Sequence, residues 1–123
     1  MRILIAIALT ALFIKPLEWS TNFEQTRKHA IEDQKLILVD IQDSNSKIEA
    51  HAELNHSEIF KKYANLHLKL LKTSVVPEFI NGTVSKNAEV LLISPDGKIL
   101  KSWTKEECLN PQEIVKEMKQ FKI

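Results

Sequence analysis

Cysteine and glycine are nearly absent from this chain of 123 residues: Cys108 is its only cysteine, and Gly82 and Gly97 are its only glycines. One cysteine cannot form an intramolecular disulfide, which excludes both a disulfide-stapled domain and an enzyme with its own dithiol. Two separated glycines cannot build a phosphate-binding loop, in which several backbone N–H groups converge on the anion. The formal net charge of +1 lacks the basic excess that is typical of nucleic-acid binding.

The first sixteen residues differ from the rest of the chain. Arg2 precedes a continuous apolar run over residues 3–14, which is shorter than the roughly 20 residues of a membrane-spanning helix. This pattern is typical of a secretion signal. We therefore expect residues 1–16 to be a signal peptide or hydrophobic export segment, and the protein to be periplasmic or secreted without further membrane contact. The alternative is a buried N-terminal strand, although twelve residues exceed the usual strand length of about 3–10.

Residues 17–123 have the length of one domain, and about 44% of the whole chain is hydrophobic, enough for one core. Thr21–Glu24 has the form of a capping box, which predicts a helix whose buried face includes Phe23, Ala30 and Ile31. The short apolar run 36–41 then predicts a central strand that is covered on both faces. Helices are therefore expected on both sides of a sheet.

The second half of the chain has equally clear boundaries. Asn55–Glu58 predicts the start of a second helix, in which Ile59, Phe60 and Tyr63 face inward, and residues 66–72 predict another strand. An irregular segment over residues 74–86 follows.

A hairpin and a final helix complete the pattern. The apolar segments 89–93 and 98–103 flank Ser94–Gly97, in which proline and glycine favour a tight turn. The last helix is expected to begin with Asn110 as its cap and Pro111 as its first residue.

This order of elements, with four short motifs, resembles the thioredoxin-like superfamily, in particular its exported bacterial members. The motifs are Leu17–Trp19 before the first helix, Leu38–Asp40 at the end of the first strand, Lys47–Glu49 leading into a helix, and Ser94–Lys98 in the hairpin. The resemblance spans about residues 17–121. It implies an α/β fold, namely a three-layer α/β/α sandwich around a central mixed β-sheet.

The same resemblance implies that the active site is degenerate. Members of the family carry a Cys-x-x-Cys pair after the Val-Asp strand end, and an ungapped count puts Ser46 and Glu49 at the two positions. A gap placed earlier would align Ser46 with the second cysteine instead. The family's cis-proline position falls on Ala88, where a cis bond without proline would cost about 2.5–4 kcal/mol. Both halves of the redox site are therefore expected to be lost.

Cys108 is the one candidate for a reactive thiol. It precedes the last helix, where Lys105 favours ionisation of the thiol and Glu106 and Glu107 oppose it. The functional interpretation is a mixed or intermolecular disulfide, and the alternative is an unreactive, half-buried residue at the start of a helix.

The histidines offer no recognisable metal or hydrolase motif. His51 and His56 are five residues apart and His67 lies beyond them, so neither HxxxH nor HExxH spacing occurs. His51 lies about 140° round a helix from Ser46, so a serine–histidine pair is not expected to form. We expect no metal and no cofactor.

Two hypotheses about function remain. The first is an exported thioredoxin-fold protein without a dithiol site, acting as a non-catalytic protein-binding, peptide-binding or chaperone-like module whose partner is an exported protein or an extended peptide. The alternative is a protein related to thiol–disulfide oxidoreductases that acts through Cys108 or a partner's thiol. The expected losses lean against an enzyme, and the sequence defines neither the partner nor the oligomeric state.

Overall fold

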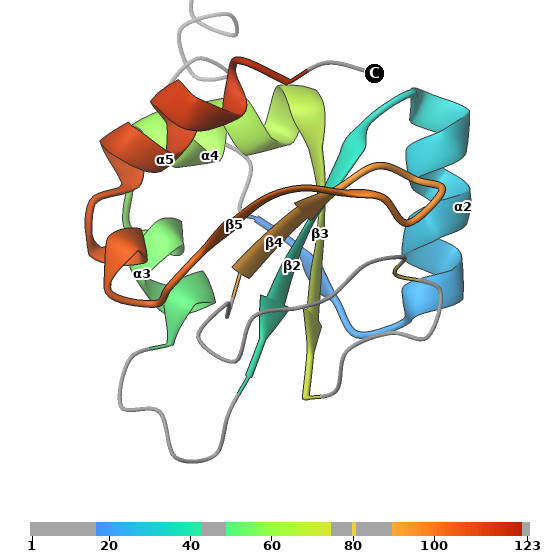
Figure 1. Cartoon of the computed structure of the whole chain (residues 1–123), viewed down its shortest axis with the longest axis horizontal. Coiled ribbons are helices and arrows are strands. Elements are labelled where there is room, and N and C mark those ends of the chain that lie inside the picture. Colours follow the sequence, from blue (N-terminus) through green and yellow to red (C-terminus); the bar gives the residue numbers. More distant parts are fainter. Residues whose placement is uncertain (1–16, 43–48, 75–79, 81–89, 122–123) are drawn as a thin grey trace, which may run out of the picture.

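The computed structural model describes residues 17–42, 49–74, 80 and 90–121. In these residues a five-stranded mixed sheet is covered by helices on both faces (Figure 1). The strands are β1 (Trp19–Ser20), β2 (Leu36–Ile41), β3 (Leu68–Thr73), β4 (Val90–Ile93) and β5 (Ile99–Trp103). The helices are α2 (Phe23–Asp33), α3 (Ala50–Asn55), α4 (Glu58–His67), α5 (Pro111–Met118) and the short 3₁₀ helix η1 (Glu107–Leu109).

The strand order in the sheet is β1-β3-β2-β4-β5. Strands β1, β3 and β2 are parallel, whereas β4 runs antiparallel to both β2 and β5. Every residue of β2 pairs with β3, from Leu36 opposite Leu68 to Ile41 opposite Thr73. The expected α/β class with a central mixed sheet is confirmed.

The side chains of β2 alternate between two core layers, which explains why the strand is apolar from Leu36 to Val39. Leu36 and Leu38 pack in the layer that contains residues of α3, α4 and α5. Ile37 and Val39 pack in the opposite layer, which contains Ala30 of α2. A strand that is buried on both faces does not show the alternation of polar and apolar residues that is typical of a half-exposed strand.

Local signals predicted several boundaries correctly. The strand over 36–41 is confirmed, and the hairpin forms with Gly97 at a φ of 93°, a left-handed conformation that glycine adopts without a steric penalty. The last helix begins at Pro111 as expected, although the side chain of Asn110 makes no capping hydrogen bond. Ser57 caps α4 by accepting a hydrogen bond from the Phe60 N–H.

Three expectations about individual side chains were wrong. Asn22 caps α2 in place of Thr21: its Oδ1 accepts a hydrogen bond from the Gln25 N–H at 3.0 Å, because the helix begins one residue later than the capping box implied. Ile31 is exposed because the buried stripe of α2 runs through Thr26 and Ala30. Ile59 is also exposed, since α4 buries Phe60 and Ala64 instead.

Candidate functional site

A fully buried carboxylate, Asp40, lies near the carboxyl end of β2. Asp40 lies two residues after Leu38, so its side chain is on the same face of the sheet, in the layer of α3, which begins beyond this end of the strand. In open α/β sheets the carboxyl ends of the strands are where ligand-binding sites commonly form. A charged group buried at this edge therefore marks the first candidate site.

His51, the second residue of α3, holds Asp40 in two ways. Its Nδ1 lies 2.8 Å from Oδ2 of Asp40, and its backbone N–H donates to the same oxygen at 3.1 Å. The first N–H groups of a helix lack partners within the helix, so the carboxylate satisfies one of them. The other oxygen, Oδ1, is buried and has no hydrogen-bond partner among the described residues. An unsatisfied buried acceptor costs about 1–3 kcal/mol, so the position of Asp40 is energetically demanding.

The imidazole of His51 is fixed by its surroundings and is largely buried, with 14% of its side chain exposed. Trp19 of β1 contacts it edge to face, with ring centroids 5.9 Å apart and planes inclined at 63°. The indole N–H of Trp19 donates in turn to Oδ1 of Asn55 in α3, at 2.8 Å. Glu49 is exposed, and its Oε2 lies 3.8 Å from Nε2 of His51.

This arrangement fixes the orientation of the His51 imidazole. Asp40 occupies Nδ1, which leaves Nε2 as the ring atom that faces Glu49. Such a pair orients a histidine in hydrolases, but hydrolysis also needs a nucleophile beside Nε2. Among the described residues only Glu49 lies within ion-pair distance of Nε2. Its carboxylate is not the hydroxyl or thiol nucleophile that such a histidine activates.

The sequence-predicted site residues fall in different places. Glu49 lies beside His51, while Ser46 and Ala88 lie outside the described residues. Cys108 is fully buried in η1, in the same apolar cluster as Ala50 and Leu54 of α3. It is more deeply buried than the sequence suggested, and in this conformation its thiol is inaccessible to a disulfide approaching from solvent.

The Asp40–His51 contact was missed by reasoning from the sequence, which treated Asp40 as the end of a strand and His51 as a solvated or capping residue. A signal was present, however. An aspartate within a strand that is otherwise apolar and buried requires a donor, and the next helix supplies a histidine in its first turn. The length of the segment between β2 and α3 did not indicate that His51 would be the partner of Asp40.

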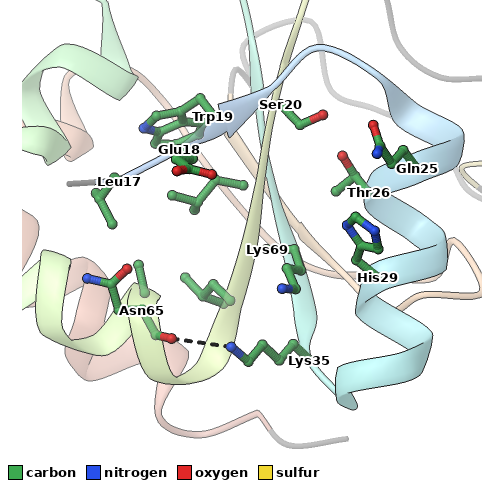
Figure 2. A pocket seen from close by; sticks show the side chains of 13 residues that line it. Leu17, Glu18, Trp19, Ser20, Gln25, Thr26, His29, Lys35, Asn65 and Lys69 are labelled. Atoms are coloured by element: carbon green, nitrogen blue, oxygen red, sulfur yellow. Dashed lines mark hydrogen bonds between the residues drawn. The ribbon is translucent and has the colours of Figure 1, made fainter. Parts of the chain in front are cut away.

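A second feature is a hollow along the β1 edge of the sheet, here called the edge groove (Figure 2). It has a volume of about 510 Å³ and is walled by α2 on one side of the sheet and by the end of α4 on the other. Residues Leu17–Ser20 and Leu68–Leu70 contribute the strand edge between these walls. The groove thus opens onto both layers of the fold and onto the sheet edge itself.

The groove has a basic end. Lys69 Nζ pairs with Oδ2 of Asp33 at 2.8 Å, and Lys35 Nζ donates to the backbone oxygen of Asn65 at 3.2 Å. The hydrogen bond from Lys69 and its charge hold the pKa of Asp33 below its ordinary value, with smaller contributions from Lys35 and His29. One carboxylate therefore lies in the field of two ammonium groups.

Other site types find no support in the part of the chain that the structure describes. No group of three or more His, Cys, Asp or Glu side chains there is arranged to hold a metal ion. None of the helices in the described ranges is long and apolar enough to cross a membrane. Comparison of the chain with protein-family models, with curated proteins and with solved structures finds no match.

Proposed function

We propose that this chain is an exported member of the thioredoxin-like superfamily that has lost dithiol chemistry and acts by binding an extended polypeptide. The scaffold implied by the sequence resemblance is a mixed sheet of parallel strands and an antiparallel hairpin between helical layers. The sheet order β1-β3-β2-β4-β5, with α2 on one face and α3, α4 and α5 on the other, is compatible with that scaffold.

The chemistry beside the end of β2 argues against redox catalysis. Thiol–disulfide exchange needs a thiolate nucleophile and a resolving thiol within bridging distance. Asp40 and His51 carry no sulfur, so neither can attack a disulfide as a thiolate or form a mixed disulfide with it. Cys108 is buried in the apolar core, so the alternative of a single-cysteine redox protein would require that core to open.

The observation that carries the binding proposal is the edge groove. An open sheet edge between two helices allows an extended polypeptide to add main-chain hydrogen bonds and to place alternate side chains against either wall. Natural proteins usually shorten, charge or cover such edges, since an open edge is a template for pairing. Here β1 covers only two residues of β3.

Two measurements test this function. Insulin reduction with dithiothreitol should proceed at the uncatalysed rate for the wild type and for Cys108→Ala, because no accessible thiol is available. A reduced and carboxymethylated unfolded protein, labelled with fluorescein, should bind the chain with a saturable rise in anisotropy, whereas the native form of the same protein should not.

The outcomes separate the two hypotheses. Insulin reduction that disappears in Cys108→Ala would establish the redox alternative and overturn the proposal. Absence of binding to the unfolded protein would also overturn it. Substitutions at Ser46, Glu49 and Ala88 locate the site: binding that survives all three lies outside the groove used by redox-active relatives.

A further inference from the structure

We infer that the edge groove binds an extended peptide segment that carries an acidic side chain, with the peptide backbone along the start of β3 and the carboxylate between Lys35 and Lys69. This inference rests on the proposed function and deepens it, since it names the place of binding and the chemistry of the partner.

The pairing of β3 leaves room for one more strand segment. On its inner side, all six residues of β3 pair with β2. On its outer side, β1 pairs only at Leu70 and Leu71, opposite Trp19 and Ser20. The start of β3, at Leu68 and Lys69, is therefore not paired with β1. These two residues line the groove together with Leu70, and Leu17 and Glu18 line it from the segment before β1.

The walls of the groove fit an extended chain better than a compact ligand. Successive side chains of a strand point to opposite faces of a sheet. Alternate side chains of an added peptide would therefore reach the α2 wall, where Thr26 and His29 lie, and the α4 wall, where Ala64 and Asn65 lie. A small molecule in the groove would not extend the sheet through a series of main-chain hydrogen bonds.

Charge selects an acidic partner. Lys35 donates only to a neutral carbonyl and takes part in no ion pair among the described residues. Lys69 pairs with the carboxylate of Asp33, and the charge of Lys35 also acts on that carboxylate, so one negative group faces two positive ones. Figure 2 shows Lys35 and Lys69 at the lower end of the groove and Glu18 beside Trp19, away from Lys35. A peptide carboxylate at the lower end would balance the excess positive charge.

The chain's own N-terminal segment lacks this complementarity. Residues 1–16 precede Leu17 at the groove, but they contain Arg2 and Lys15 and no aspartate or glutamate. In the groove, residues 1–16 would place further positive charge beside Lys35 and Lys69. The charge balance therefore favours a separate acidic polypeptide.

The test uses the full chain and a fluorescein-labelled peptide of eight residues that alternates threonine and valine around a central glutamate. Matched peptides carry glutamine or lysine at the centre, and a fourth carries the glutamate with alternate backbone nitrogens methylated. Anisotropy titrations should give the tightest binding for the glutamate peptide. The methylated peptide should not bind, because it cannot donate the main-chain hydrogen bonds of an added strand.

Substitutions in the protein define the site. Lys35→Glu should weaken binding of the glutamate peptide by about ten-fold, since it replaces an attraction with a repulsion at the same place. The same variant should bind the lysine peptide more tightly than the wild type does, a charge-swap gain that damage to the fold would not produce. Lys101→Glu is the matched control, because Lys101 is exposed on β5 at the opposite edge of the sheet.

Several results would overturn the inference. These are equal binding of the glutamate, glutamine and lysine peptides, equal effects of Lys35→Glu and Lys101→Glu, undiminished binding of the methylated peptide, and full competition by millimolar acetate, which would indicate a site for small anions. If the reduced and carboxymethylated test protein still binds to the chain in any of these cases, the proposed function stands and only this placement is wrong. If no polypeptide binds, both are wrong.

Discussion

Replacing His51 with leucine is the most direct test of the buried pair at the end of β2. The substitution removes the imidazole and keeps the backbone N–H of residue 51, so Asp40 would retain one of its two donors to Oδ2. Removing one partner of a buried hydrogen bond leaves the other unsatisfied, at a cost of about 1–3 kcal/mol. The N–H bond to Oδ2 remains and His51 is partly exposed, so we expect the free energy of unfolding to fall by about 2 kcal/mol.

A double-mutant cycle separates the contact from the other effects of each change. Asp40→Leu alone removes the carboxylate and leaves His51 without its acceptor. The double variant Asp40→Leu/His51→Leu buries two apolar side chains, a replacement that is often neutral for buried pairs. We therefore expect a coupling energy of about 2 kcal/mol, with the double variant at least as stable as His51→Leu.

The assay is urea unfolding at pH 7, monitored by far-UV circular dichroism. The free energy of unfolding must depend on urea concentration with the same slope in all variants. His56→Leu is the matched control, because His56 is exposed, and it should change the free energy of unfolding by less than about 0.5 kcal/mol. Additive single effects, or a cost of His51→Leu no larger than that of the control, would refute the conclusion that His51 holds Asp40.

Two further predictions concern carboxyl groups whose pKa is lowered in the folded protein. The Ser94 hydroxyl donates to Asp96 and lowers its pKa, so Ser94→Ala should raise the pKa of Asp96 toward 3.8. Lys69→Met should likewise raise the pKa of Asp33, whose lowering comes mainly from Lys69. A depressed folded-state pKa gives stability that is present above the ordinary pKa and lost as pH falls through the depressed one, and each substitution should reduce that acid-range dependence. Carbon-detected NMR titration of the carboxyl groups measures both, and an unchanged pKa would contradict the assigned cause.

The parts of the fold that sequence reasoning predicted are those with local causes. The strand 36–41 is apolar at every position except Asp40 because both faces of β2 are covered. The hairpin depends on Ser94–Gly97, where the turn residues themselves determine the backbone. The start of α5 follows from Pro111, whose fixed φ and missing N–H suit a first helical position. In each case a few adjacent residues suffice.

The parts that were missed depend on contacts between distant segments. Strand β1 has only two residues and no strand pattern of its own, and it forms because β3 offers an edge at Leu70 and Leu71. The Asp40–His51 contact joins residues eleven positions apart in two different elements, and its geometry depends on where α3 begins. The edge groove requires β1, α2, β3 and α4 together. Periodicity and turn chemistry act over shorter distances than any of these contacts.

Trp19 links the two candidate sites and gives the buried pair a use that requires no reaction. Its ring packs against His51, which Asp40 orients, and its indole N–H is bound by Asn55. Trp19 is also the first residue of β1, so the same contacts determine where β1 leaves the edge of β3 and hence where the groove opens. An unsatisfied oxygen on Asp40 is a cost that packing alone would not favour. On this argument, the polar pair holds the short edge strand in place, beside the open edge that we propose as the binding site.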